Sequence, residues 1–126
     1  MDMRLEVVML PVSDVDASIS FYRDRVGFVL DHDVQPGNGF RVVQLTPPGS
    51  ACSIVFGAGM GGLAVPGSVR NTHLVVDDVQ AAREAAVANG IEVSEVQDMG
   101  GVKYAYFADP DGNTWAFQEI GPASRP

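Results

Sequence analysis

The sequence predicts an α+β fold made of two βαβββ modules with curved mixed sheets. Three observations predict it: an internal repeat, short apolar runs separated by Gly/Pro turns, and two amphipathic segments that each follow an Asp and precede a Gly. The repeat pairs LPVSDVDAS (10–18) with LVVDDVQAA (74–82), and five of its positions are identical. A doubled supersecondary unit explains such a repeat.

The first module begins with the apolar run LEVVMLPV (5–12), which is typical of a strand. Asp14 follows as a helix N-cap, because its side chain can accept a hydrogen bond from a free N–H of the first turn. The amphipathic segment 15–25 is then expected to be a helix that ends at Gly27. Three strands separated by PGNG and TPPGS turns complete the unit, at residues 28–34, 40–45 and 51–56.

The second module repeats this order. HLVV (73–76) predicts a strand, and a helix from about residue 79 to residue 89 should end before Gly90. Three further strands are expected, separated by MGG and DPDGN turns. They are IEVSEV (91–96), KYAYF (103–107) and TWAFQE (114–119).

These elements fit one domain over residues 1–126, since a chain of this length buries enough surface for a single core. We expect the first module over about 1–57 and the second over about 70–120. A Gly/Pro-rich linker joins them at about 58–69, and a short tail covers 121–126.

The glycine run GAGMGG (57–62) matches the spacing of a dinucleotide-binding motif. That motif requires a helix directly after the glycines, but Leu-Ala-Val-Pro-Gly follows here. The run is therefore interpreted as part of the linker.

The net charge of −8 opposes binding to nucleic acids and to anionic membranes, since both depend on Lys and Arg. No run approaches the ~18 apolar residues of a membrane span, and the N-terminus lacks the pattern of a signal peptide. Cys52 is the only cysteine, which favours a reducing compartment. We expect a cytoplasmic protein.

Several of these segments together resemble the vicinal oxygen chelate superfamily, which includes glyoxalase I, extradiol dioxygenases and bleomycin-resistance proteins. The segments are VSDVDASISFY with the helix-ending Gly27, HLVVDDVQAA and FADPDGNTW, in the same order and at similar spacing. The resemblance covers nearly the whole chain. It implies sheets that enclose a cavity, helices on the outer face, and a homodimer, since homodimers are common in this superfamily.

Side chains alternate between the two faces of a strand, which assigns each of them to the helix side or the cavity side of its sheet. Phe107, Trp115 and Phe117 are bulky and apolar and should face the helices, so their neighbours face the cavity. Whether the cavity forms within one chain or across a dimer stays open. The expected ligand-binding residues are Val7, Met9, Phe40, Val42, Gln44, Ser53, Val55, Asn71, His73, Tyr104, Tyr106, Ala116 and Gln118.

In the family pattern, metal-dependent members carry one His or Glu ligand on the first strand and one on the last strand of each module. Those positions correspond here to Val7, Asn71 and Ala116, with a fourth near Ser53. Valine and alanine have no donor atom, and Asn and Ser are weak oxygen ligands. We therefore expect no metal and no other cofactor.

The DPDG turn (109–112) is acidic, but it lacks the ligand spacing of an EF-hand. Its residues suit a tight turn, with Pro fixing φ, Asp bonding nearby backbone and Gly adopting positive φ. We interpret it as structural.

The leading hypothesis is a metal-free protein that binds a small organic molecule. His73 is the candidate catalytic residue, because its unperturbed pKa lies near neutrality, although it could equally be bonded within the cavity wall. Tyr104 and Tyr106 could stack on a planar ligand. The alternatives are a metal-dependent lyase, epimerase or dioxygenase, and metal-free acid/base catalysis by His73.

Overall fold

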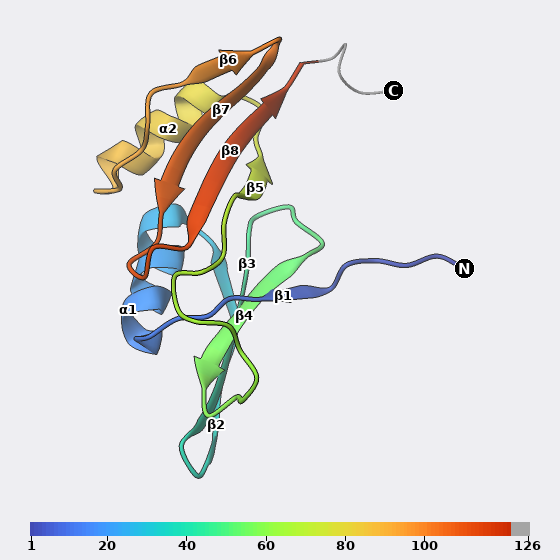
Figure 1. Cartoon of the computed structure of the whole chain (residues 1–126), viewed down its shortest axis with the longest axis vertical. Coiled ribbons are helices and arrows are strands. Elements are labelled where there is room, and N and C mark those ends of the chain that lie inside the picture. Colours follow the sequence, from blue (N-terminus) through green and yellow to red (C-terminus); the bar gives the residue numbers. More distant parts are fainter. Residues whose placement is uncertain (122–126) are drawn as a thin grey trace.

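The computed structural model describes residues 1–121, which form two four-stranded mixed sheets and two helical segments (Figure 1). Most of the predicted tail, from residue 122 on, lies outside the described residues. The first sheet has the order β1-β4-β3-β2, and only the β1–β4 pair is parallel. Its strands are β1 (Val7–Met9), β2 (Val29–Gly37), β3 (Phe40–Thr46) and β4 (Ser53–Ala58).

The second sheet repeats this topology in the order β5-β8-β7-β6, again with one parallel pair, β5–β8. The predicted α+β fold of two βαβββ modules is therefore confirmed. Its strands are β5 (Thr72–Val75), β6 (Gln97–Met99), β7 (Val102–Ala108) and β8 (Thr114–Ile120).

The helix of the first module starts as predicted, with the Asp14 side chain accepting a hydrogen bond from the Ala17 N–H at 3.0 Å. It is α-helical as α1 (Val15–Ile19) and continues as a π-helix, η1 (Ser20–Val26). Gly27 ends it in the left-handed region, at φ 97°. Glycine is suited to this position because it lacks the Cβ that makes positive φ costly.

The second helix, α2 (Val79–Ala88), is capped by Asp78 in the same way, through the Ala81 N–H at 3.0 Å. The Glu119 carboxylate of β8 accepts from the Val79 N–H at 2.8 Å, so this acidic side chain lies on the helix side of the sheet. Within residues 1–121, neither helical segment has the length and apolar character needed to cross a membrane.

The predicted strand at 91–96 is wrong: this segment is irregular, and β6 begins only at Gln97. Two bonds tie Ser94 to Tyr106 of β7, but one of them uses the Ser94 hydroxyl in place of the backbone. The Arg83 guanidinium of α2 donates to the Ser94 carbonyl at 2.7 Å. Side chains therefore occupy groups that a regular strand would use for backbone pairing.

The helical segment α1 packs against β4, and α2 packs against β7 and β8 (Figure 1). The apolar core lies between these helical segments and the sheets. Its centre is a group of aromatic rings in which Tyr22 lies 5.6 Å from Phe28, 5.6 Å from Trp115 and 6.1 Å from Phe56. Residues from both modules thus share one core.

The other side of each sheet is uncovered, and the two sheets do not close around a cavity within this chain, which corrects the enclosed arrangement that the resemblance implied. We call these surfaces the open faces. The first comprises residues 7, 9, 40, 42, 44, 53 and 55, and the second comprises residues 73, 75, 104, 106, 116 and 118.

A buried carboxylate joins the modules. Asp109, only 5% exposed, begins the β7–β8 turn and accepts from the Tyr22 hydroxyl of η1 at 2.7 Å. It also accepts from the N–H groups of Asp111 and Asn113 and from the Asn113 side chain, at 2.8–3.0 Å. The Trp115 indole N–H donates to the Tyr22 oxygen at 2.9 Å. We call Tyr22, Asp109, Asn113 and Trp115 the Asp109 cluster.

Asn113 extends this junction. Its side-chain amide donates to the Pro11 carbonyl at 2.9 Å, and its side-chain oxygen accepts from the Val69 N–H at 3.1 Å. Asp111 accepts from the Ser13 N–H at 3.1 Å. The acidic turn is therefore structural, as its residue types predict, and its side chains are used for contacts between the modules.

We predict that Asp109→Ala lowers the free energy of unfolding by ~3 kcal/mol or more, because it leaves several buried donors without an acceptor. Urea unfolding measures this. Asp24→Ala is the matched control, since its carboxylate is exposed and pairs only with the neighbouring Arg23, and it should change little. Equal effects of the two substitutions would contradict the structural role of Asp109.

Burial, with the Asp109 carboxylate adding to it, raises the pKa of Tyr22 far above its ordinary value. We predict that Tyr22 stays protonated in the folded state, and that its contribution to stability is constant below about pH 10 and falls above it, because only the unfolded chain releases this proton there. Phenolate absorbance should then show one of the three tyrosines ionising together with unfolding. A Tyr22→Phe variant should lose that coupled step.

Candidate functional site

The second open face carries the candidate catalytic histidine. His73 of β5 is paired with Ala116 of β8, which in turn is paired with Tyr106 of β7. The next row along the strands joins Val75, Gln118 and Tyr104. Paired residues share a face of the sheet. These six residues therefore lie on the side opposite the buried Trp115 and Phe117, as predicted.

Aromatic rings gather on this face around His73. The imidazole meets the Tyr104 ring edge to face, with centroids 5.8 Å apart and planes at 87°. The rings of Tyr104 and Tyr106 are nearly parallel, at 8°, with centroids 6.1 Å apart. Ala116 is fully buried beneath its neighbours, so the short side chain lies low between the larger ones.

Asn71 lies just before β5, at φ 58°, a left-handed conformation that is uncommon for residues other than glycine. Its N–H donates to the Thr114 hydroxyl at 2.8 Å, and its carbonyl lies 2.6 Å from the Nδ1 atom of His73. The Asn71 backbone therefore holds the histidine ring.

The first open face is mostly apolar. Val7 and Met9 of β1 pair with Ser53 and Val55 of β4, and Val55 also pairs with Gln44 of β3. The pairing places these side chains, with Val42 and Phe40, on the side opposite the core residues, as predicted.

Sequence reasoning missed Asp31 and Thr46 on this face. The Asp31 carboxylate accepts from the Thr46 hydroxyl and lies 3.4 Å from the Gln44 amide nitrogen, while Thr46 and Ser53 are bonded at 2.6 Å. Alternation places both residues on this face, because Thr46 is two residues after Gln44 and Asp31 follows Leu30, which pairs with the core residue Leu45. The predicted strand ended at residue 45, so Thr46 was left out of it.

The structure thus sorts the predicted residues into two groups on separate sheets, and no strand of one sheet pairs with the other within residues 1–121. Several of their apolar side chains are unusually exposed. Met9 is 41% exposed, Phe40 38% and Val75 55%. The described chain presents two partly apolar surfaces, which need a further molecule to become enclosed.

The residues at the family's metal-ligand positions do not fit a divalent metal. Val7 and Ser53 are cross-strand neighbours in the first sheet, and Ala116 in the second sheet offers no donor atom. Among residues 1–121, no group of three or more His, Cys, Asp or Glu is placed to hold a metal ion.

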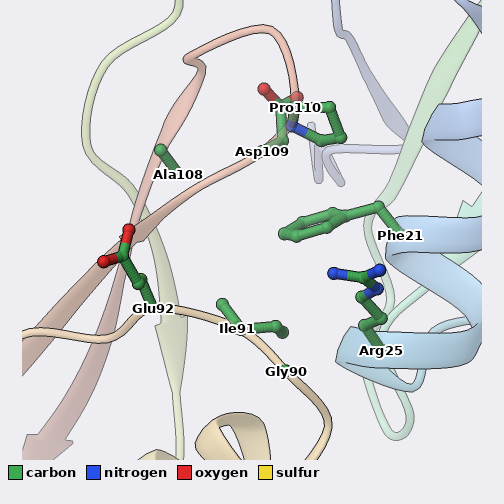
Figure 2. Close-up of a pocket in the computed structure, with 8 residues that line it drawn as sticks. All are labelled: Phe21, Arg25, Gly90, Ile91, Glu92, Ala108, Asp109 and Pro110. Atoms are coloured by element: carbon green, nitrogen blue, oxygen red, sulfur yellow. The ribbon is translucent and has the colours of Figure 1, made fainter.

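A pocket of about 500 Å³ lies on the helix side of the molecule (Figure 2). Figure 2 shows the Phe21 ring and the Arg25 guanidinium of η1 on one wall and the Glu92 carboxylate opposite. Segments distant in the sequence form it, so sequence patterns do not predict it. Its lining is Phe21, Arg25, Gly90, Ile91, Glu92, Ala108, Asp109 and Pro110.

Comparison with known proteins places this geometry in a family. Residues 4–117 match the model of the Glyoxalase/Bleomycin resistance protein/Dioxygenase superfamily. No curated protein sequence matches the chain.

Solved structures of the same kind are similar over almost their full length. TnmS3, an antibiotic binding protein from Streptomyces sp. CB03234, is 32% identical with a TM-score of 0.84, over 95% of this chain and 98% of TnmS3. A glyoxalase/bleomycin resistance protein from the same organism is 33% identical with a TM-score of 0.77, over 90% and 98%. A superfamily member from Sphaerobacter thermophilus DSM 20745 is 25% identical with a TM-score of 0.80, over 94% and 98%.

The repeated βαβββ topology, the match over residues 4–117 and the similarity to these structures agree. This chain belongs to the Glyoxalase/Bleomycin resistance protein/Dioxygenase superfamily.

Proposed function

We propose that this protein binds a small organic molecule against the open faces of its sheets, without a metal ion. The observation that carries the proposal is the make-up of these faces, which are apolar surfaces with a few polar groups in fixed places. Ligand sites in proteins have this composition, since apolar area supplies affinity and placed polar groups supply orientation. The similarity to TnmS3, an antibiotic binding protein, supports it.

The second part of the proposal is a homodimer. Exposed apolar side chains on the open faces favour coverage by another surface, and a second copy of the chain offers an equivalent one. Coverage by a partner would turn an open face into an enclosed site. The ligand would then touch residues of both chains.

The proposed setting is the cytoplasm. Cys52 is a free, partly buried thiol within the described chain, which is in keeping with a reducing compartment.

The binding site is tested by variants on opposite sides of the molecule. A thermal-shift screen of small organic molecules, antibiotics included, supplies a ligand whose affinity is then measured by calorimetry. We predict that Tyr106→Leu and Gln118→Ala each weaken binding about tenfold, the loss of roughly one or two good contacts. Arg25→Ala in the helix-side pocket is the control and should bind normally.

The opposite pattern, with binding lost in Arg25→Ala alone, would move the site to the helix side. The same ligand should be recovered unchanged after incubation. Chemical conversion that disappears in His73→Ala would instead favour acid/base catalysis.

The dimer is tested by light scattering, which should give about twice the chain mass of 13.4 kDa. We predict that Val75→Asp shifts the protein toward monomer, because a carboxylate on the second open face cannot be buried without a partner charge. Val87→Asp on α2 is the control, since Val87 is 46% exposed and Val75 55%. A monomeric wild-type protein would contradict this part of the proposal.

The metal content is tested by elemental analysis of protein purified without added metal. We predict Zn, Ni, Fe and Mn far below one ion per chain, because Val7 and Ala116 cannot coordinate an ion. A stoichiometric metal that is lost in His73→Ala would overturn the metal-free proposal in favour of a metal-dependent enzyme.

A further inference from the structure

The hydrogen bond of His73 defines where its ring proton lies. The Nδ1 atom is 2.6 Å from the Asn71 carbonyl oxygen, and a carbonyl oxygen can only accept. Nδ1 must therefore carry the proton and donate it. In the neutral ring the other nitrogen, Nε2, then has a free lone pair and acts only as an acceptor.

The backbone that fixes this ring is itself held firmly. Asn71 adopts φ 58°, which is costly for a residue with a Cβ and persists only when neighbouring contacts enforce it. The contact here is the Asn71 N–H bond to the Thr114 hydroxyl at the start of β8. One residue of β8 thus sets the carbonyl, and the carbonyl sets the tautomer of His73.

Nε2 has no hydrogen-bond partner in the part of the chain that is described. Its ring stands next to Ala116, and the Tyr106 ring stands on the far side of Ala116. Ala116 itself is fully buried between these side chains, whereas the His73 ring is exposed and the rings of Tyr104 and Tyr106 are half-buried. A ligand can therefore lie against the tyrosine rings and reach Nε2 from there.

We infer that His73 determines specificity through Nε2, which accepts a hydrogen bond from a hydroxyl group on a planar aromatic ligand lying against the Tyr104 and Tyr106 rings. The inference rests on the proposed function and adds the chemical class of the ligand. A hydroxylated ring is favoured over the same ring with a methoxy group, because the ether oxygen has no proton to donate. Thr114 and Asn71 are positioning residues.

The tautomer is tested in the free protein. Long-range ¹H–¹⁵N NMR of the His73 ring should give a protonated-type shift for Nδ1 and an unprotonated-type shift for Nε2 at a pH where the ring is neutral. Thr114→Val should blur this preference, while Asn71→Gly should keep it, because glycine adopts positive φ freely and retains the carbonyl. A ring protonated on Nε2 in the wild type would overturn the inference whether or not a ligand binds.

Specificity is tested with 2-naphthol and 2-methoxynaphthalene, titrated by NMR. The wild type should prefer the naphthol by about five- to tenfold, the usual worth of one hydrogen bond. His73→Phe keeps an aromatic ring but removes the acceptor, and should abolish the preference; His73→Ala provides a second check.

Equal binding of the two probes to the wild type, or binding of neither, would overturn the inference. The proposed function has a separate outcome, since it stands if the thermal-shift screen yields any ligand that Tyr106→Leu weakens.

Discussion

The buried carboxylate of Asp109 is the interaction on which the rest of the structure depends. Tyr22 donates to it from the first module, and the backbone and side chain of its own turn complete its shell. A charge removed from water is stable only when such donors surround it. The bond to Tyr22 therefore fixes η1 against the β7–β8 turn, and with it the position of one module against the other.

This junction determines which sides of the two sheets stay uncovered. Because η1 and α2 both pack on the side of the sheets that faces the shared core, the opposite sides stay free. Asp109 is also part of the floor of the helix-side pocket, but its oxygens are already occupied by internal donors. The open faces, in contrast, carry polar groups with unused capacity, such as Nε2 of His73.

Much of this could be predicted from the sequence, because Trp115 and Phe117 fix the sidedness of β8 and regular pairing carries it to β7 and β5. The prediction failed where side chains compete with backbone pairing. Arg83 takes the Ser94 carbonyl, and no strand forms at 91–96. Asp31 was missed because its bond to the Thr46 hydroxyl links two strands, and the residues of one strand do not show such a contact. The tautomer of His73 follows from the left-handed backbone of Asn71, and no pattern of residues predicted this conformation.

The residues at the family's metal positions change which atoms of a ligand can be recognised. A divalent cation attracts the lone pairs of a ligand's oxygen atoms. Val7 and Ala116 cannot hold such an ion, and the polar groups of the open faces include two acceptors, Nε2 of His73 and the Asp31 carboxylate. Acceptors select for hydrogen-bond donors. A protein of this fold with these residues should therefore prefer ligands that carry hydroxyl protons. The naphthol and methoxynaphthalene pair separates this recognition from recognition of oxygen lone pairs.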